Sequence, residues 1–216
     1  MKRKQSLITP AALAFVPLLF LAHTLPTNSA TTATFTDESA FLANLSSFTT
    51  HNFDSFSTDT SNPLVLNQQI PGIDFDNAVV YPGCCGGTFK SGPNVVLNQD
   101  FATPIVFFFN TPVLAVGLFN TSLVDAERFE VFDAQNNLLA SINLPNAVVN
   151  FGGFISDMGI AKGIVTPIAP TNGSIYIDDL TVASFALIPE PSTFILLLAG
   201  IFGVSAHRYW RRKKVA

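Results

Sequence analysis

The chain has 216 residues, and the part between its two unusual ends is long enough for one domain with a substantial core. Charged residues make up only 12% of the chain, and 21 residues are phenylalanine, a composition that favours β-sheets packed face to face. Eight of the eleven Lys and Arg residues lie near the termini, so residues 31–187 carry three basic and fourteen acidic side chains. Such an acidic segment repels nucleic acid, which we exclude as a partner, and the charge keeps a Phe-rich domain soluble.

Residues 1–30 have the organisation of an export signal peptide. Three basic residues at positions 2–4 precede an apolar segment at 11–22, and a polar stretch then ends in Ala30. The apolar segment is too short to span a bilayer comfortably, so cleavage is favoured over an uncleaved anchor. We expect cleavage after Ala30, with Ala33 as the rival position. The remaining chain would then fold outside the cytoplasm.

The middle of the chain, residues 31–187, predicts one all-β domain with a short helix at its start. The helix is expected at residues 36–45, because Thr36 can cap it and its apolar side chains share one face. The strands that we expect after it are short, apolar or alternating, and separated by turn residues; they cover 105–109, 113–119, 129–132, 138–142, 151–155, 160–165 and 174–182. Strands at this spacing with antiparallel turns predict a β-sandwich or jelly roll.

The C-terminus, residues 188–216, consists of three segments in a fixed order. Pro189, Glu190 and Pro191 come first, and an apolar run over residues 193–206 follows. As a helix, Ser192 to Trp210 would be about 28 Å long, close to the roughly 30 Å of a hydrocarbon core. The side chains that we expect in the membrane include Phe194, Leu197, Ile201 and Val204, and those of the basic stop on the cytoplasmic side are Arg208, Arg211, Arg212, Lys213 and Lys214.

This tripartite end resembles the PEP-CTERM sorting signal. The resemblance implies that Pro189, Glu190 and Pro191 are recognised by an exosortase, an integral-membrane protease-like transpeptidase that processes the tail near the motif. It also implies a Gram-negative bacterium that makes exopolysaccharide, and a route through an inner-membrane intermediate to the cell surface or extracellular matrix. A plain tail anchor that is never cleaved is the alternative.

The middle domain also resembles many secreted bodies that carry this sorting signal, and its closing strand is similar to that of carbohydrate-binding jelly rolls. The motifs that carry this resemblance are Phe53-Asp54, Val116-Gly117-Leu118, Phe132-Asp133-Ala134 with Asn137, residues 151–157, and Ile177-Asp178-Asp179-Leu180. The resemblance implies a fold and no activity.

Nothing in the sequence predicts a catalytic centre. His51 is the one histidine of the middle domain, and we expect it in an exposed loop. A Ser-His-Asp triad and a His-rich zinc site are therefore hard to assemble. Two carboxylates at a set separation would suffice for a glycosidase, and Glu127 and Glu130 are the candidates. We expect no enzyme, and a secreted glycoside hydrolase is the least favoured alternative.

Acidic pairs on strands make calcium the one cofactor to consider. Asp178 and Asp179 form one candidate pair and Asp74 and Asp76 another, because calcium is bound by carboxylate and carbonyl oxygens. Solvated acids that bind no metal are the competing interpretation.

Cys84 and Cys85 are adjacent between glycines and are the only cysteines of the chain. In an oxidising compartment they could form a vicinal disulfide or a bridge to another chain, and two reduced thiols are the alternative.

The sequence as a whole predicts an exported cell-surface or matrix protein with a non-enzymatic body, sorted by an exosortase. A carbohydrate-binding module for exopolysaccharide is the first alternative. It requires exposed aromatic side chains on one sheet face. The middle domain has only Tyr81 and Tyr176 as tyrosines and lacks tryptophan, which counts against a strong sugar platform.

Overall fold

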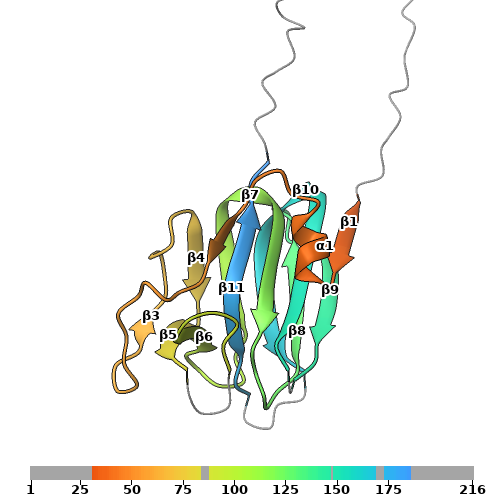
Figure 1. Cartoon of the computed structure of the whole chain (residues 1–216). Coiled ribbons are helices and arrows are strands. Elements are labelled where there is room, and N and C mark those ends of the chain that lie inside the picture. Colours follow the sequence, from red (N-terminus) through yellow and green to blue (C-terminus); the bar gives the residue numbers. More distant parts are fainter. Residues whose placement is uncertain (1–30, 84–87, 147, 169–172, 186–216) are drawn as a thin grey trace, which may run out of the picture.

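The computed structural model describes residues 31–83, 88–146, 148–168 and 173–185. Within them the chain forms eleven strands and one short helix (Figure 1). In chain order these are β1 (Thr32–Phe35), α1 (Glu38–Leu42), β2 (Thr49–His51), β3 (Leu64–Val65), β4 (Ile73–Asp76), β5 (Ala78–Pro82), β6 (Asn94–Asn98), β7 (Ile105–Asn120), β8 (Glu127–Phe132), β9 (Leu138–Leu144), β10 (Asn150–Pro167) and β11 (Tyr176–Ala183).

Two long antiparallel strands, β7 and β10, belong to both layers of the fold. β7 pairs with β4 through residues 106–109 and with β11 through residues 115–120. β10 pairs with β8 through residues 162–167 and with β1 through residues 153–156. The register between β7 and β10 shifts where the two strands pass from one layer to the other.

The first layer therefore has the order β4-β7-β10-β8-β9, and the second has the order β3-β5-β6-β11-β7-β10-β1, with β2 also on β11. All pairs are antiparallel, so the predicted antiparallel β-sandwich is confirmed. The segments predicted as separate strands, 105–109 with 113–119 and 151–155 with 160–165, are joined in β7 and β10. Each strand bends between layers without ending.

Phenylalanine rings fill the space between the layers. Phe107 is fully buried, and its ring centroid lies 5.9 Å from that of Phe75 and 6.0 Å from that of Phe129. The ring of Phe129 is in turn 5.0 Å from that of Phe154. Interlocking rings from four strands account for part of the high phenylalanine content, because aromatic pairs at these distances stabilise a core beyond their buried area.

The helix α1 begins at Glu38, and its N-cap is Asp37, whose Oδ1 accepts the N–H of Ala40 at 2.7 Å. The prediction of Thr36 as the cap was wrong by one residue, because the carboxylate of Asp37 reaches the free N–H group of the first turn. The helix is also shorter than the predicted 36–45. It buries Phe41 completely against the outer side of the second layer.

A pair of glycines makes room for the ring of Phe41. Gly117 on β7 lies directly opposite Gly153 on β10. A Cβ on Gly153 would approach the Phe151 ring to 2.8 Å and the Phe41 ring to 2.9 Å. Because neither glycine has a side chain, both rings pack onto the bare backbone of the sheet. This explains one glycine in each of two motifs noted above, Gly117 in Val116-Gly117-Leu118 and Gly153 in 151–157.

We therefore predict that Gly153→Ala destabilises the protein by about 1–3 kcal/mol, the usual cost of overpacking a core. The measurement is chemical unfolding followed by circular dichroism. Combining it with Phe151→Leu, which opens space beside the added methyl group, should cost less than the sum of the two single changes. Strictly additive costs would show that the methyl group meets no steric obstacle there.

Candidate functional site

Several predicted site residues lie outside the described residues. These are the signal peptide at 1–30, the two cysteines, the sorting motif, the apolar segment and the basic stop, namely Cys84, Cys85, Pro189, Glu190, Pro191, Phe194, Leu197, Ile201, Val204, Arg208, Arg211, Arg212, Lys213 and Lys214. In the part of the chain that the structure describes, no helix is long and apolar enough to cross a membrane.

Asp178 on β11 holds a loop onto the outer side of the second layer. Its side chain is fully buried, and its Oδ2 accepts the N–H groups of Lys90 and Ser91, both at 3.0 Å. Its Oδ1 accepts the N–H of Asp179 at 2.8 Å. Both oxygens of the carboxylate thus accept backbone N–H groups. For Lys90 and Ser91 the carboxylate takes the place of the carbonyl acceptors that a neighbouring strand would provide.

Asp179 binds the same loop from a bulge in β11, and the two carboxylates together are called the clamp here. Its φ is 48°, in the left-handed region, and the register to β7 shifts between Asp178 and Thr181. The bulge directs the Asp179 carboxylate to the same loop as that of Asp178, where Oδ1 accepts the Ser91 hydroxyl at 2.6 Å. In a regular strand the two side chains would point to opposite faces.

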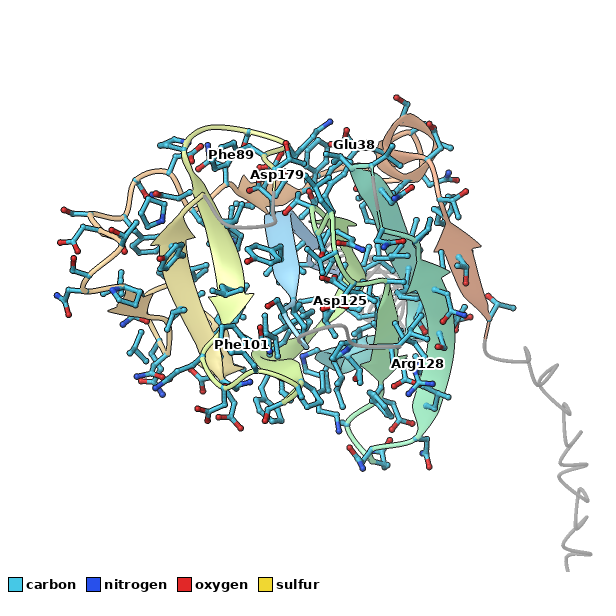
Figure 2. All side chains as sticks on the ribbon, turned by 90° about the horizontal axis from the view of Figure 1, so that it is seen from below. Glu38, Phe89, Phe101, Asp125, Arg128 and Asp179 are labelled. Carbon is cyan, nitrogen blue, oxygen red and sulfur yellow. The ribbon has the colours of Figure 1, made fainter. Side chains whose placement is uncertain are left out.

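The surroundings of the clamp are mostly acidic. Lys90 Nζ lies 3.0 Å from Glu38 Oε2 and 4.3 Å from the centroid of the Phe119 ring. Asp54 accepts the N–H of Asn94 at 3.2 Å, at the far end of the same loop. The structure therefore brings the Phe53-Asp54 and Asp178-Asp179 motifs together around one loop, and Figure 2 shows Glu38 and Asp179 on the same side of the molecule.

Burial raises the pKa of Asp178 to about 6, although the N–H groups that it accepts oppose this shift. Burial also raises the pKa of Asp179; the Ser91 hydroxyl and Lys90 oppose the shift, and Glu38 and Asp54 add to it.

The second predicted pair, Asp74 and Asp76, lies on the outward face of β4, which belongs to the first layer, whereas Asp178 and Asp179 belong to the second. Asp74 is opposite Phe108 and Asp76 is opposite Val106. Calcium binding by either pair stays a prediction. Among the described residues, no three His, Cys, Asp or Glu side chains gather in a metal-binding arrangement.

The two carboxylates considered for a glycosidase point to opposite faces of β8. Glu127 is fully buried, whereas Glu130 lies on the outer face, where Arg128 Nε is 3.4 Å from its Oε1. The alternation of side chains along a strand keeps the two apart. They do not form a facing pair.

Glu127 belongs instead to a buried polar cluster at the end of the sandwich where β8 and β11 begin, which is the lower end in Figure 1. The sequence did not predict this cluster. Its members are all at most 2% exposed: Asn98, Asn120, Ser122, Asp125, Glu127 and Ser174. Glu127 Oε1 accepts the Tyr176 N–H at 2.8 Å, and Asp125 Oδ2 accepts the Ser174 N–H at 3.1 Å. The only signal in the sequence was the asparagine that ends each of two apolar strands, at positions 98 and 120.

His51 was predicted in an exposed loop, which is wrong: it ends β2 and is half-buried, because β2 pairs with β11. Burial lowers its pKa. It borders a hollow of about 270 Å³ between the edges of the two layers, where Thr49, Phe109 and Ser184 also contribute.

Comparison with known proteins identifies one family model, and several solved structures show a distant likeness, of which three are described here. Residues 187–213 match the PEP-CTERM protein-sorting motif. The K2 cleaved adhesin domain of Lys-gingipain is 11% identical, with a TM-score of 0.36 over 71% of this chain and 99% of that one. A DUF4465 family protein from Bacteroides caccae is 10% identical, with a TM-score of 0.38 over 70% and 99%. A family 35 carbohydrate-binding module from Clostridium thermocellum is 18% identical, with a TM-score of 0.36 over 57% and 98%.

Likenesses this distant carry no argument about function, and no curated protein sequence matches the chain. The family match confirms the resemblance predicted from the C-terminal residues: the chain has a PEP-CTERM sorting motif at residues 187–213.

We predict that Asp178→Asn lowers the free energy of unfolding by about 1–3 kcal/mol, because the amide leaves one buried N–H group without an acceptor. The folded-state pKa of about 6 lies above the ordinary value for aspartate. The contribution of Asp178 is therefore fully present below about pH 4 and declines as the pH rises through the folded-state pKa.

The cost of the substitution should thus be larger near pH 4.5 than near pH 7.5 when unfolding is measured in urea. Asp76→Asn, on an exposed side chain, is the control and should cost little at either pH. A cost that grows with pH would show that the loop stabilises the ionised form of Asp178.

Proposed function

We propose that this chain is an exported protein sorted by an exosortase, and that its β-sandwich is a non-enzymatic module delivered to the cell surface or the extracellular matrix. The observation that carries the proposal is the sorting motif at residues 187–213, which begins just after β11 ends at Ala183. The export signal predicted at 1–30 would bring the chain to the membrane that holds the exosortase.

The placement of the two chain ends supports this route. The N–H of Thr31 donates to Asp157 Oδ1 at 2.9 Å, and the ring of Phe185 packs beside the neighbouring Gly159. Both ends of the described chain therefore lie at the same end of the sandwich (Figure 1). A body tethered there keeps the outer face of the first layer accessible while the tail is in the membrane.

The use of the acidic side chains supports a non-enzymatic body. Glu127 and Glu130 face opposite ways, and both oxygens of Asp178 accept backbone N–H groups. A general acid or base must lie within hydrogen-bond reach of the proton that it transfers. The carboxylates of Glu127 and Asp178 are buried, so they do not present their oxygens to a substrate at the surface.

Replacing Pro189, Glu190 and Pro191 together by Ala should leave the protein in the inner membrane with its tail intact. The measurement is membrane fractionation followed by mass spectrometry of the C-terminal peptide. The wild-type protein in cells that lack the exosortase is the matched control and should behave in the same way. Wild-type protein that still carries Trp210 at its final location would show that the tail is not processed.

A second candidate function, carbohydrate binding, is favoured by one feature of the first layer. Phe108 on β7 and Phe132 on β8 both lie directly opposite Lys162 on β10, so the three side chains share the outer face. Phe108 is 44% exposed, and Lys162 Nζ lies 4.3 Å from the centroid of the Phe132 ring. An exposed aromatic ring offers a surface on which a sugar ring stacks, and the neighbouring ammonium group attracts acidic groups of a polysaccharide.

The test is retention on purified extracellular polysaccharide. Phe108→Ala should weaken binding about tenfold, which corresponds to roughly 1.4 kcal/mol. Phe101→Ala is the control, because Phe101 is 61% exposed but lies in the loop between β6 and β7. Equal retention of the two variants would remove this face from consideration.

A further inference from the structure

Thr31, the first described residue, is joined to Asp157 on β10 by its backbone and by its side chain. Its N–H donates to Asp157 Oδ1 at 2.9 Å, and its hydroxyl donates to Oδ2 at 3.3 Å. The N–H of Asp157 in turn donates to the Thr31 carbonyl oxygen at 3.3 Å, which continues the pairing of β1 with β10 by one residue. Asp157, the last residue of the 151–157 motif, thus directs both carboxylate oxygens at one residue.

The carboxylate of Asp157 is exposed and has no basic side chain as its partner among the described residues. The ion pairs of those residues join Lys90 to Glu38 and Arg128 to Glu130. The nitrogen that Asp157 contacts belongs to the main chain. In an uncleaved chain this nitrogen is a neutral amide with one hydrogen, whereas in a chain that begins at Thr31 it is an ammonium group with a positive charge and three hydrogens.

The two candidate cleavage positions have different consequences for β1. Both follow a small residue, as signal cleavage requires, so the sequence leaves both open. Cleavage after Ala30 keeps β1 whole, with all its pairs to β10. Cleavage after Ala33 removes residues 31–33, and with them the first two of the pairs. It also removes the Thr32 hydroxyl, which donates to the hydroxyl of the fully buried Ser156 at 3.0 Å.

From this register we propose that a membrane signal peptidase cleaves the chain between Ala30 and Thr31, and that the α-ammonium group released there forms an ion pair with Asp157. This rests on the export route proposed above. The bond between the Ala30 carbonyl carbon and the Thr31 nitrogen breaks. Water supplies the second oxygen of the Ala30 carboxylate and both hydrogens that turn the Thr31 amide nitrogen into an ammonium group. A charge-assisted hydrogen bond then replaces a neutral one and fixes the mature N-terminus to β10.

The elements packed against β1 carry few charges that could compete for this ammonium group. These elements are β10, β9 and α1. Neither β1 nor β9 has a titratable side chain. The helix and its N-cap carry Glu38 and Asp37, and β10 carries Lys162 besides Asp157. Of these four side chains, Asp157 is the one that contacts Thr31.

The first measurement is the N-terminus of the protein purified from cells that produce the full chain, determined by mass spectrometry of the N-terminal peptide. We expect a chain that begins at Thr31. An exported chain that begins at Thr34, or that still begins at Met1, overturns this inference and leaves export intact. A chain that stays uncleaved in the cytosol overturns export itself, and this inference with it.

The second measurement is the melting temperature of the purified protein with Asp157→Asn, which keeps the shape of the side chain and removes its charge. At pH 6.5 the substitution should lower the melting temperature by about 1–3 °C, the range for an exposed ion pair in a domain of this size. An α-amino group has an ordinary pKa of about 8, and a carboxylate beside it favours its charged form in the folded state. The stability that the pair contributes is therefore present below about pH 8 and lost at higher pH, so the substitution should cost little at pH 9.5.

Asp76→Asn, which removes an exposed charge on β4, is the matched control and should change the melting temperature equally at the two pH values. A cost of Asp157→Asn that is the same at pH 6.5 and pH 9.5 would show that Asp157 has a neutral amide as its partner, and would overturn the ion pair.

Discussion

The antiparallel pairing of β7 with β10 is the interaction on which the rest of the structure depends. These two strands pass through both layers, so each layer is built outward from the same pair. Where the two strands pair at Gly117 and Gly153, the rings of Phe41 and Phe151 take the space of the missing side chains. The two glycines therefore allow the helix to pack against the second layer through Phe41.

Carboxylates connect the loops to this frame. Asp178 accepts two N–H groups of the loop between β5 and β6, and Glu127 accepts one at the start of β11. Asp133 does the same within a hairpin, where it accepts the N–H groups of Gln135 and Asn137. Much of the acidity of the domain thus serves as acceptors for backbone groups that no strand pairs, which a solvated surface charge would not do.

The sorting motif and the β-sandwich occupy separate parts of the chain. The sorting motif begins within a few residues of the last strand, and both ends of the described chain lie at one end of the sandwich. The opposite end holds the buried acidic cluster, and the outer face of the first layer carries Phe108 beside Lys162. The sorting motif and the candidate binding face are therefore contributed by different parts of the chain.

The sequence alone determined the tail, the all-β class and the presence of the Gly and Asp-Asp motifs, because these are local in the chain. The tail is read from the order of proline, apolar and basic residues, and strands are read from periodicity. Only the tertiary structure decided that Asp178 binds a loop through both oxygens, that His51 is half-buried and that Glu127 faces inward beside Asp125. Those facts depend on which strand lies opposite and on a single bulge at Asp179, and strand register over long sequence separations is set by packing, which no local pattern encodes.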